Sequence, residues 1–501
     1  MIPLNSIRSR FAVSLVSNIL RGLLTLLTTI FLARLLGADD YGRIAFIVAT
    51  FQSLRQLLDP GVSSAFYTFL SQKMRSAAFL STYGVFLLGK YLMIIFVLGM
   101  LMPDSWISYV WRGESRDILI FALSAVLIQF EWWPSVMYIL ESQRRTVLAQ
   151  SLYLILLALQ LIGVYILYLL GILTIMNFML MSSVLWAGGT ICSILYYIPN
   201  LIVKSKVENQ FSLQEYLVYC VPMVYLGFLS FFVEFFDRWL IQAYAGSREQ
   251  SYFSVSQQVA AIILILTSSL IKVLWKEIAE SLHSNRIEHA WSLYSKTKKG
   301  LYFASVFIAA GLAPWSEEIL AVIFGLDYIQ AAPVFMIMIF AATFQTLGQI
   351  EGALMMASGK TRTGLYYNII STPLSMVLSY ILIVGTYELG EQVFSPLGAI
   401  GLAVKLLVVQ VFSVNVLGYL LCEKLSWKFE WLYQISTIIV LVTISSLAKI
   451  ILCDIFQNLL TSFVIVNILY AIAVLSFASI FPRLLETGFK INYYKIMHSN
   501  K

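Results

Sequence analysis

Ten ionisable side chains lie within hydrophobic runs of this 501-residue sequence. A charge at the middle of a bilayer costs free energy, so such residues usually face a water-filled cavity and mark a pathway for ions or polar molecules. The bases suit the binding of an anionic group, and the acids suit the exchange of a proton or a sodium ion. Five are bases and five are acids: Arg21, Arg55, Lys90, Arg238 and Lys405, and Asp59, Glu131, Glu234, Asp237 and Glu351.

Polar residues of the first hydrophobic run recur at steps of three and four positions. This spacing places them on one face of a helix, and we expect that face to line the interior of the protein. In the next run, Arg55 and Asp59 are four positions apart, close enough to pair on a helix. The stripe of the first run consists of Ser14, Asn18, Arg21, Thr25 and Thr28.

These charges also have a structural interpretation, because ion pairs and polar contacts join helices inside membranes. Glu234 and Arg238 are four positions apart, and both interpretations remain open for them. Lys90 and Lys405 have no obvious partner nearby in the sequence, which favours a role in a cavity. Glu351 lies near the end of its run, where contact with water alone would explain it.

Hydrophobic residues make up 60% of the sequence and charged residues 12%, whereas a soluble globular protein has about 45–50% and about 25%. The chain is therefore predicted to be an integral membrane protein. Its apolar runs are long enough to cross the hydrocarbon core and predict an all-α polytopic membrane protein of about fourteen transmembrane helices. They lie near residues 11–33, 44–64, 79–102, 118–140, 147–170, 176–199, 217–244, 252–273, 300–323, 332–355, 364–386, 397–421, 433–453 and 461–481.

Lys and Arg residues alternate between connections as the positive-inside rule predicts. Most of the 33 lie in connections on one side of the predicted membrane, together with both termini. We therefore predict a multi-pass protein of the cytoplasmic (inner) cell membrane with both termini cytoplasmic. The net charge of +7 is attributed to this topology rather than to nucleic-acid binding. The longest connection, residues 276–299, carries an imperfect apolar stripe and is predicted to lie along the cytoplasmic surface.

Two pairs of similar segments indicate an internal repeat. LARLLGADDYGRIAF from Leu32 resembles IQAYAGSREQSYFSV from Ile241, and ESQRRT from Glu141 resembles ASGKTRT from Ala357. Both offsets correspond to six spans, so two six-helix halves are predicted in a pseudo-two-fold arrangement, followed by two C-terminal helices. The predicted parts are residues 1–200 (spans 1–6), 201–425 (spans 7–12) and 426–501 (spans 13–14 and a cytoplasmic tail).

The sequence lacks motifs for catalysis, metals or nucleotides. The G-x-x-x-x-G-K-[ST] nucleotide-binding loop does not occur. A membrane glycosyltransferase or polymerase would normally carry a long loop with catalytic residues, and this chain has none. We therefore expect neither an enzyme nor a cofactor or metal. The four cysteines lie in or at the ends of hydrophobic runs without metal-like spacing: Cys192, Cys220, Cys422 and Cys453.

The sequence resembles the O-antigen (Wzx-type) flippases of the multidrug/oligosaccharidyl-lipid/polysaccharide exporter superfamily. The resemblance is densest in the first two spans, where it is carried by Asn18, Arg21, the run LARLLGADDYGRIAF and the segment DPGVSSAF from Asp59. Spans seven and eight add Asp237, Arg238, Gly246 and Tyr252. The resemblance implies an alternating-access fold of two six-helix lobes around a central cavity.

The resemblance also implies a substrate, an oligosaccharide on polyprenyl pyrophosphate. We expect the carboxylates inside the spans to couple its transport to a proton or sodium gradient, and we expect polysaccharide assembly proteins as partners. A drug/cation antiporter of the same superfamily, which the bases Arg21, Arg55 and Lys90 disfavour, and a lipid II flippase are the alternatives. The candidate substrate-binding residues are Arg21, Arg55, Lys90, Arg238, Lys405 and Asn18. The candidate ion-coupling residues are Asp59, Glu131, Asp237, Glu234 and Glu351.

Overall fold

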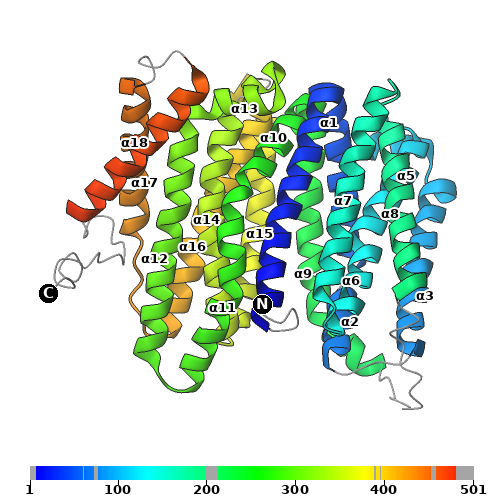
Figure 1. Cartoon of the computed structure of the whole chain (residues 1–501), viewed down its shortest axis with the longest axis horizontal. Helices are drawn as coiled ribbons and strands as arrows, with labels where there is room; N and C mark the ends of the chain where they lie inside the picture. Colours follow the sequence, from blue (N-terminus) through cyan, green and yellow to red (C-terminus); the bar gives the residue numbers. More distant parts are fainter. Residues whose placement is uncertain are drawn as a thin grey trace. The chain divides into compact units, whose positions relative to one another are not determined.

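The structure is a computed structural model of the chain, and it describes residues 7–59, 61–72, 77–197, 213–388, 391–394, 396–452 and 458–480. Helices account for nearly all of these residues (Figure 1). The strands of the described part form one antiparallel hairpin, β1 (Thr386–Glu388) with β2 (Glu391–Phe394). The helical fold class is therefore confirmed, and the hairpin occupies a connection between two predicted spans.

Contacts along the chain divide it into two compact units, Met1–Ser254 and Val255–Lys501, and helix α10 (Ser247–Ala260) crosses this boundary. The first unit holds α1 (Ile7–Leu58), α2 (Val62–Gln72), α3 (Ala77–Phe96), η1 (Val97–Leu101), α4 (Asp104–Val110), α5 (Arg116–Leu127), η2 (Ile128–Trp132), α6 (Trp133–Ser142), α7 (Thr146–Leu169), α8 (Ile175–Tyr197), α9 (Leu213–Leu240) and η3 (Ile241–Ala245). The second holds α11 (Ile262–His283), α12 (Ile287–Leu312), η4 (Ala313–Trp315), α13 (Ser316–Phe324), η5 (Leu326–Ala331), α14 (Ala332–Ala357), α15 (Thr361–Val384), β1, β2, α16 (Gly398–Lys424), α17 (Leu432–Leu452) and α18 (Leu459–Ile480).

Eleven helical segments of the described part are long and apolar enough to cross a membrane. The first, Val13–Leu58, contains both predicted runs 11–33 and 44–64, apart from their outermost residues. The predicted runs 217–244 and 252–273 correspond to α9 with η3 and to α10 with α11. Each of the fourteen predicted runs therefore lies mainly on helix, and the chain is a multi-pass membrane protein.

A glycine interrupts the helix at the same place in both halves of the predicted repeat. Gly37, inside α1, has φ 82° and ψ 172°, and Gly246, between η3 and α10, has φ 89° and ψ 178°. This backbone region is essentially restricted to glycine. Each glycine thus ends one helix and lets the next begin at an angle, which explains why both repeated segments carry one.

The second pair of repeated segments also shares a backbone geometry. Arg144 and Gly359 both adopt a positive φ, 63° and 68°, directly after a helix. In each turn the next backbone N–H donates to a carbonyl five positions earlier, from Arg145 to Leu140 (2.9 Å) and from Lys360 to Met355 (3.1 Å). These are equivalent helix C-terminal caps. The lobe boundaries at residues 200 and 425 stay a prediction, since neither observation locates them.

Residues 276–299 do not form a surface helix, which corrects the sequence prediction. They comprise the end of α11, a turn at residues 284–286 and the first half of α12. The apolar side chains of this stretch, including Ile278 and Tyr294, pack in a core cluster with Ile350, Leu354 and Leu421. Ile278 and Tyr294 of the stripe are thus buried against α14 and α16, whereas Ile287 at the turn is 49% exposed.

Candidate functional site

Arg21 on α1 presents unpaired guanidinium atoms within the first unit. Its Cζ lies 4.3 Å from the ring centroid of Tyr153 on α7, and that ring packs edge-on against the buried Trp186 of α8. Its Nε and Nη2 atoms are shielded from solvent and have no hydrogen-bond partner among the described residues. Shielded donors cost free energy until a partner arrives, and a guanidinium fork matches phosphate or carboxylate. Such donors have the chemistry that an anion requires.

Arg55 and Asp59 lie at the end of α1, and no ion pair joins them, although the structure describes both. The Nε of Arg55 is shielded and lacks a partner among the described residues, as in Arg21. The carboxylate of Asp59 instead accepts the backbone N–H of Ser63 at 2.9 Å, near the first turn of α2. The backbone N–H of Asp59 still donates to the Arg55 carbonyl at 2.9 Å, so the expected pair is absent because the carboxylate caps α2 instead of turning toward Arg55.

Lys90 and Glu131 form a buried ion pair between α3 and the π-helical turn η2. The Lys90 ammonium donates to Glu131 Oε1, and the two residues are 8% and 2% exposed. The other carboxylate oxygen, Oε2, has no partner within the described part of the chain. Lys90 thus has the partner that its sequence neighbourhood does not reveal. A π-turn inserts an extra residue into a helix and is frequent at functional sites.

A chain of hydroxyl groups leads from α2 to the same π-turn. Ser63 Oγ lies 3.0 Å from the hydroxyl of Tyr83, which lies 3.2 Å from Ser135 Oγ. Ser135 in turn donates to the backbone carbonyl of Glu131 at 2.7 Å. Since Ser135 donates its only proton to this carbonyl, Tyr83 must donate to Ser135, and Ser63 to Tyr83. The chain therefore has a fixed direction and ties three helices to the turn that carries Glu131.

The acids and base of α9 contact neighbouring helices of the first unit. Glu234 accepts a hydrogen bond from Gln56 at 2.8 Å. Arg238 donates to Ser254 at 3.1 Å, and its Cζ lies 4.6 Å from the ring centroid of Phe253. Asp237 is buried. Polar contact between helices therefore accounts for part of the role of Glu234 and Arg238, as the structural interpretation expects.

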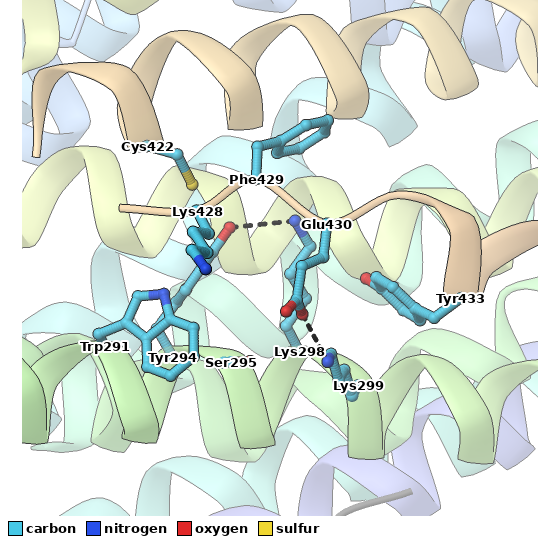
Figure 2. A pocket seen from close by; sticks show the side chains of 10 residues that line it. All are labelled: Trp291, Tyr294, Ser295, Lys298, Lys299, Cys422, Lys428, Phe429, Glu430 and Tyr433. Atoms are coloured by element: carbon cyan, nitrogen blue, oxygen red, sulfur yellow. Dashed lines mark hydrogen bonds and ion pairs between the residues drawn. The ribbon is translucent and has the colours of Figure 1, made fainter. Parts of the chain in front are cut away.

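Glu351 on α14 is fully buried in the second unit, which corrects the expectation that it contacts water. Its Oε1 accepts from Lys298 at 2.6 Å and from the hydroxyl of Tyr294 at 2.7 Å. Lys298 also donates to that hydroxyl at 3.0 Å, and Figure 2 shows the two side chains together. Glu351 and Lys298 are 0% and 4% exposed. Both partners come from α12, in the segment that the sequence prediction placed on the surface.

The connection between α16 and α17 covers this cluster. Phe429 places its ring centroid 5.3 Å from the Lys298 ammonium, and Glu430 pairs with Lys299 at 2.5 Å (Figure 2). The cavity left between these side chains measures about 10 Å³, room for a single water molecule. The cluster is therefore closed to anything larger than water.

The remaining predicted site residues lie apart from these clusters. Asn18 is exposed on α1, one turn before Arg21, and Lys405 is buried on α16 in the second unit. Among the described residues, no group of three His, Cys, Asp or Glu side chains could hold a metal ion. Cys192, Cys220 and Cys422 are free thiols, and Cys453 lies outside the described residues.

Sequence reasoning missed Tyr83, Ser135, Tyr294 and Lys298. The two tyrosines do not stand out from the many other aromatic residues of the sequence. Ser135 is an uncharged residue inside a predicted span. Lys298 falls in the predicted connection 276–299, where a lysine indicates contact with water. A signal did exist, since Tyr294 and Lys298 are four positions apart and would share a face if α12 began at Ile287.

Solved membrane transporters have a similar fold. "Lipid II flippase MurJ, inward closed conformation" matches with a TM-score of 0.67 and 17% identity, covering 94% of this chain and 99% of that one. An inward-facing multidrug resistance MATE family transporter of the MOP superfamily gives 0.63 and 12%, covering 81% and 94%. A MOP superfamily transporter from Pyrococcus furiosus gives 0.56 and 12%, covering 83% and 94%. The chain therefore has the polytopic fold of the MOP-superfamily transporters.

The sequence family is shown by a separate comparison. Residues 31–333 match the family described as polysaccharide biosynthesis protein. Because this match covers more than half of the chain, the protein belongs to that family. No curated protein matches the chain significantly.

Proposed function

We propose that the protein flips an oligosaccharide linked to polyprenyl pyrophosphate across the cytoplasmic membrane, by alternating access and without enzymatic chemistry. Family membership supports a place in polysaccharide biosynthesis, and the fold supports transport. The O-antigen type of repeat unit is the substrate that the sequence resemblance favours. The polar head would cross through the protein while the polyprenyl tail stays in lipid.

The observation that carries this proposal is the pair of shielded Arg21 donors, Nε and Nη2, which have no hydrogen-bond partner among the described residues. Buried N–H groups without a partner are rare in folded proteins, because each costs free energy comparable to a lost hydrogen bond. A pyrophosphate offers several acceptor oxygens in the geometry of the guanidinium fork. Arg55, on the part of α1 that follows Gly37, supplies another shielded donor, its Nε. Arg21, Arg55 and the nearby Asn18 form the proposed head-group site.

The ion pair of Lys90 and Glu131 gives a route to coupling. Protonation of Glu131 would cancel its charge and leave the Lys90 ammonium available to a phosphate oxygen. Proton binding and head-group binding would then favour each other, because the two are linked through one lysine. Asp59 and Asp237 are further coupling candidates, Glu234 and Arg238 serve mainly in contacts between helices, and Lys405 remains a candidate head-group contact.

The orientation of the chain follows from its basic connections. We place the protein in the inner membrane with both termini in the cytoplasm. Polysaccharide assembly proteins would use the flipped unit. In a background without the native cysteines, a cysteine at Ser284 should be labelled from the cytoplasmic side and one at Glu388 from the opposite side. Labelling of both from one side would contradict this orientation.

Lipid II flipping is the second candidate, because the lipid II flippase covers nearly the whole chain in the fold comparison. A sequence identity of 17% does not indicate which substrate is transported. The rates of flipping of the two lipid-linked substrates must therefore be compared directly. Drug or cation antiport is disfavoured by the shielded donors of Arg21 and Arg55, which would repel a cation.

The test is flipping of a fluorescent polyprenyl-pyrophosphate oligosaccharide in reconstituted vesicles. Arg21→Ala should lower the rate on the order of 30-fold or more, since truncating a buried charged contact costs about 2–5 kcal/mol. Arg21→Lys should keep part of the activity, because charge is retained while the fork is lost.

Arg112→Ala is the matched control, because Arg112 also lies over an aromatic ring, Trp239, but is exposed. This control should flip the substrate normally. Wild-type rates for Arg21→Ala would remove the head-group site. If the protein moves lipid II alone, lipid II is the substrate in place of the oligosaccharide lipid. If it moves cationic dyes alone, it is a cation antiporter and the proposed function is wrong.

A further inference from the structure

An apolar groove runs between α15 and α16 in the second unit. It has a volume of about 340 Å³ and is lined mainly by aliphatic and aromatic side chains. Among them are Ile370 and Leu374 of α15 and Phe412 and Val416 of α16. Ile370 is 73% exposed, so these side chains are not covered by the rest of the chain. A lining of this kind suits hydrocarbon and offers sugars almost nothing to hydrogen-bond.

The mouth of the groove is basic. The Lys424 ammonium at the end of α16 donates to the hydroxyl of Thr363 at 2.6 Å, which fixes it over the entrance. Lys360 and Arg362 lie exposed at the start of α15, whose first turn contains no acid. None of these three cations forms an ion pair among the described residues. The partial positive charge of the helix N-terminus adds to their field.

One polar atom inside the groove lacks a partner. The hydroxyl of Tyr367 is shielded from solvent and makes no hydrogen bond to any described residue. Tyr367 lies one helical turn beyond Thr363, just below the basic mouth. A carbonyl oxygen placed between the charged mouth and the apolar floor would satisfy it.

The dimensions of the groove match a single leaflet. Thr363 and Leu374 are eleven positions apart on α15, which corresponds to about 16 Å along the helix axis. The hydrocarbon core of a bilayer is about 30 Å thick, so the groove extends through about half of it. Its basic end lies, on the orientation proposed above, at the cytoplasmic surface.

We infer that this groove binds an anionic glycerophospholipid of the cytoplasmic leaflet. The phosphate contacts Lys424 and Arg362, an ester carbonyl accepts from Tyr367, and one acyl chain lies along Ile370 and Leu374. Charge complementarity and a depth of one leaflet favour this occupant over the substrate's own polyprenyl chain. The site is distinct from the head-group site around Arg21 and does not depend on it.

Lipid retention by the purified full-length protein tests the inference without any transport assay. The probes are phosphatidylglycerol, phosphatidylcholine and polyprenyl phosphate, counted by native mass spectrometry at equal concentrations. Each basic residue near the membrane surface contributes about 1 kcal/mol to binding an anionic lipid, so Lys424→Gln should weaken phosphatidylglycerol retention roughly fivefold. Retention of phosphatidylcholine, which carries no net charge, should not change.

Two matched controls separate the groove from general charge and bulk. Lys428→Gln removes the same charge from an exposed lysine outside the groove, and should leave retention unchanged. Leu374→Trp should fill the groove and prevent cross-linking of phosphatidylglycerol with a diazirine on its acyl chain. Val377→Trp, at an exposed position of α15 outside the groove, should leave this cross-linking unchanged.

Equal retention by wild type and Lys424→Gln would remove the headgroup contact, as would displacement of phosphatidylglycerol by an equal amount of polyprenyl phosphate. Cross-links that avoid the segments around Ile370 and Phe412 would remove the acyl-chain site. If Lys424→Gln is poorly folded by circular dichroism, Arg362→Gln replaces it, because Arg362 is exposed and its loss should weaken retention similarly.

Discussion

In the part of the chain that the structure describes, each unit contains a buried lysine–glutamate pair, and the two pairs have different surroundings. Lys90 with Glu131 joins α3 to η2, in predicted spans three and four, and Lys298 with Glu351 joins α12 to α14, the helices that contain predicted spans nine and ten. In the first unit the glutamate Oε1 has one partner, whereas in the second it has two, because the Tyr294 hydroxyl also donates to it. The other oxygen, Oε2, lacks a hydrogen-bond partner among the described residues in both glutamates. The same pair of helices in each half is thus bridged with different strength.

The repeat explains why the pairs are similar without being equivalent. The equivalent caps at Arg144 and Gly359 are 215 positions apart, so Ser135 and Glu351, which are 216 positions apart, correspond to within one residue. In this part of the repeat the first unit has a tyrosine–serine hydrogen bond (Tyr83 to Ser135), and the second a tyrosine–glutamate bond (Tyr294 to Glu351). The first unit keeps its charge pair one turn away, on the π-turn. We infer that the C-terminal cluster, which consists of Tyr294, Lys298 and Glu351, serves to stabilise the fold. The N-terminal pair of Lys90 and Glu131 can instead change partners.

The largest expected effect is loss of stability on breaking the C-terminal cluster. Glu351→Ala should lower the free energy of unfolding by about 3–5 kcal/mol, because it leaves a buried lysine without its counter-charge. The apolar double variant Lys298→Met with Glu351→Leu should recover most of this loss, since no unpaired charge remains. Thermal unfolding in detergent measures both.

Glu131→Ala provides the comparison within the first unit. It should cost less than Glu351→Ala by about 1.5–3 kcal/mol, the value of one hydrogen bond to a charged group. Equal losses for the two alanine variants would contradict the distinction between a structural and a switching pair.

Transport should separate the pairs by its pH dependence. If protonation of Glu131 releases Lys90, flipping should rise as pH falls, and the permanently neutral Glu131→Gln should flip at a rate that no longer varies with pH. Glu351→Gln should keep the pH dependence of the wild type, whatever its effect on yield. A rate–pH profile of the three proteins in vesicles decides this, and an unchanged profile for Glu131→Gln would return Glu131 to a structural role.

Two glycines near the C-terminal cluster test how tightly it is packed. A Cβ at Gly418 would lie 2.9 Å from Glu351 Oε1 and 3.1 Å from a ring carbon of Phe429, so Gly418→Ala should cost about 1–3 kcal/mol through overpacking. A Cβ at Gly348 would meet its neighbours at 3.6 Å or more. Gly348→Ala should therefore be neutral or stabilising by up to about 1 kcal/mol, through helix propensity. Unfolding midpoints of the two variants should shift in opposite directions or differ clearly.

The helical spans were predictable because hydrophobic length alone determines them. The turns at Gly37 and Gly246 were found as a repeat, since their backbone conformation requires glycine at a fixed offset. Partners of buried charges were not predictable in the same way. Lys90 and Glu131 are 41 positions apart, and only the packing of α3 on the π-turn brings them together.

The error at residues 276–299 has a different cause. Periodicity identified the apolar face of this stretch, but an apolar face can meet a membrane surface or another helix. The charge of Lys298 favoured the surface, yet its side chain is neutralised by Glu351 more than fifty positions away. Long-range pairing therefore reversed a conclusion that was reasonable locally.

The smallest expected effect concerns the hydroxyl chain of the first unit. Tyr83→Phe removes the group that links Ser63 to Ser135 while keeping the ring, which stacks on Phe66. The loss should be about 1 kcal/mol, typical of one neutral hydrogen bond. Tyr91→Phe is the matched control. Tyr91 lies on the same helix, and its hydroxyl contacts Ser124 at 2.9 Å, which is not part of the hydroxyl chain from Ser63 to Ser135. Both variants should lose similar stability. Only Tyr83→Phe should alter the pH dependence of flipping, because the hydroxyl chain that contains Tyr83 ends at the turn that carries Glu131. If the two variants behave alike in that profile, the hydroxyl chain merely joins helices, and the difference between the two units lies in the ion pairs alone.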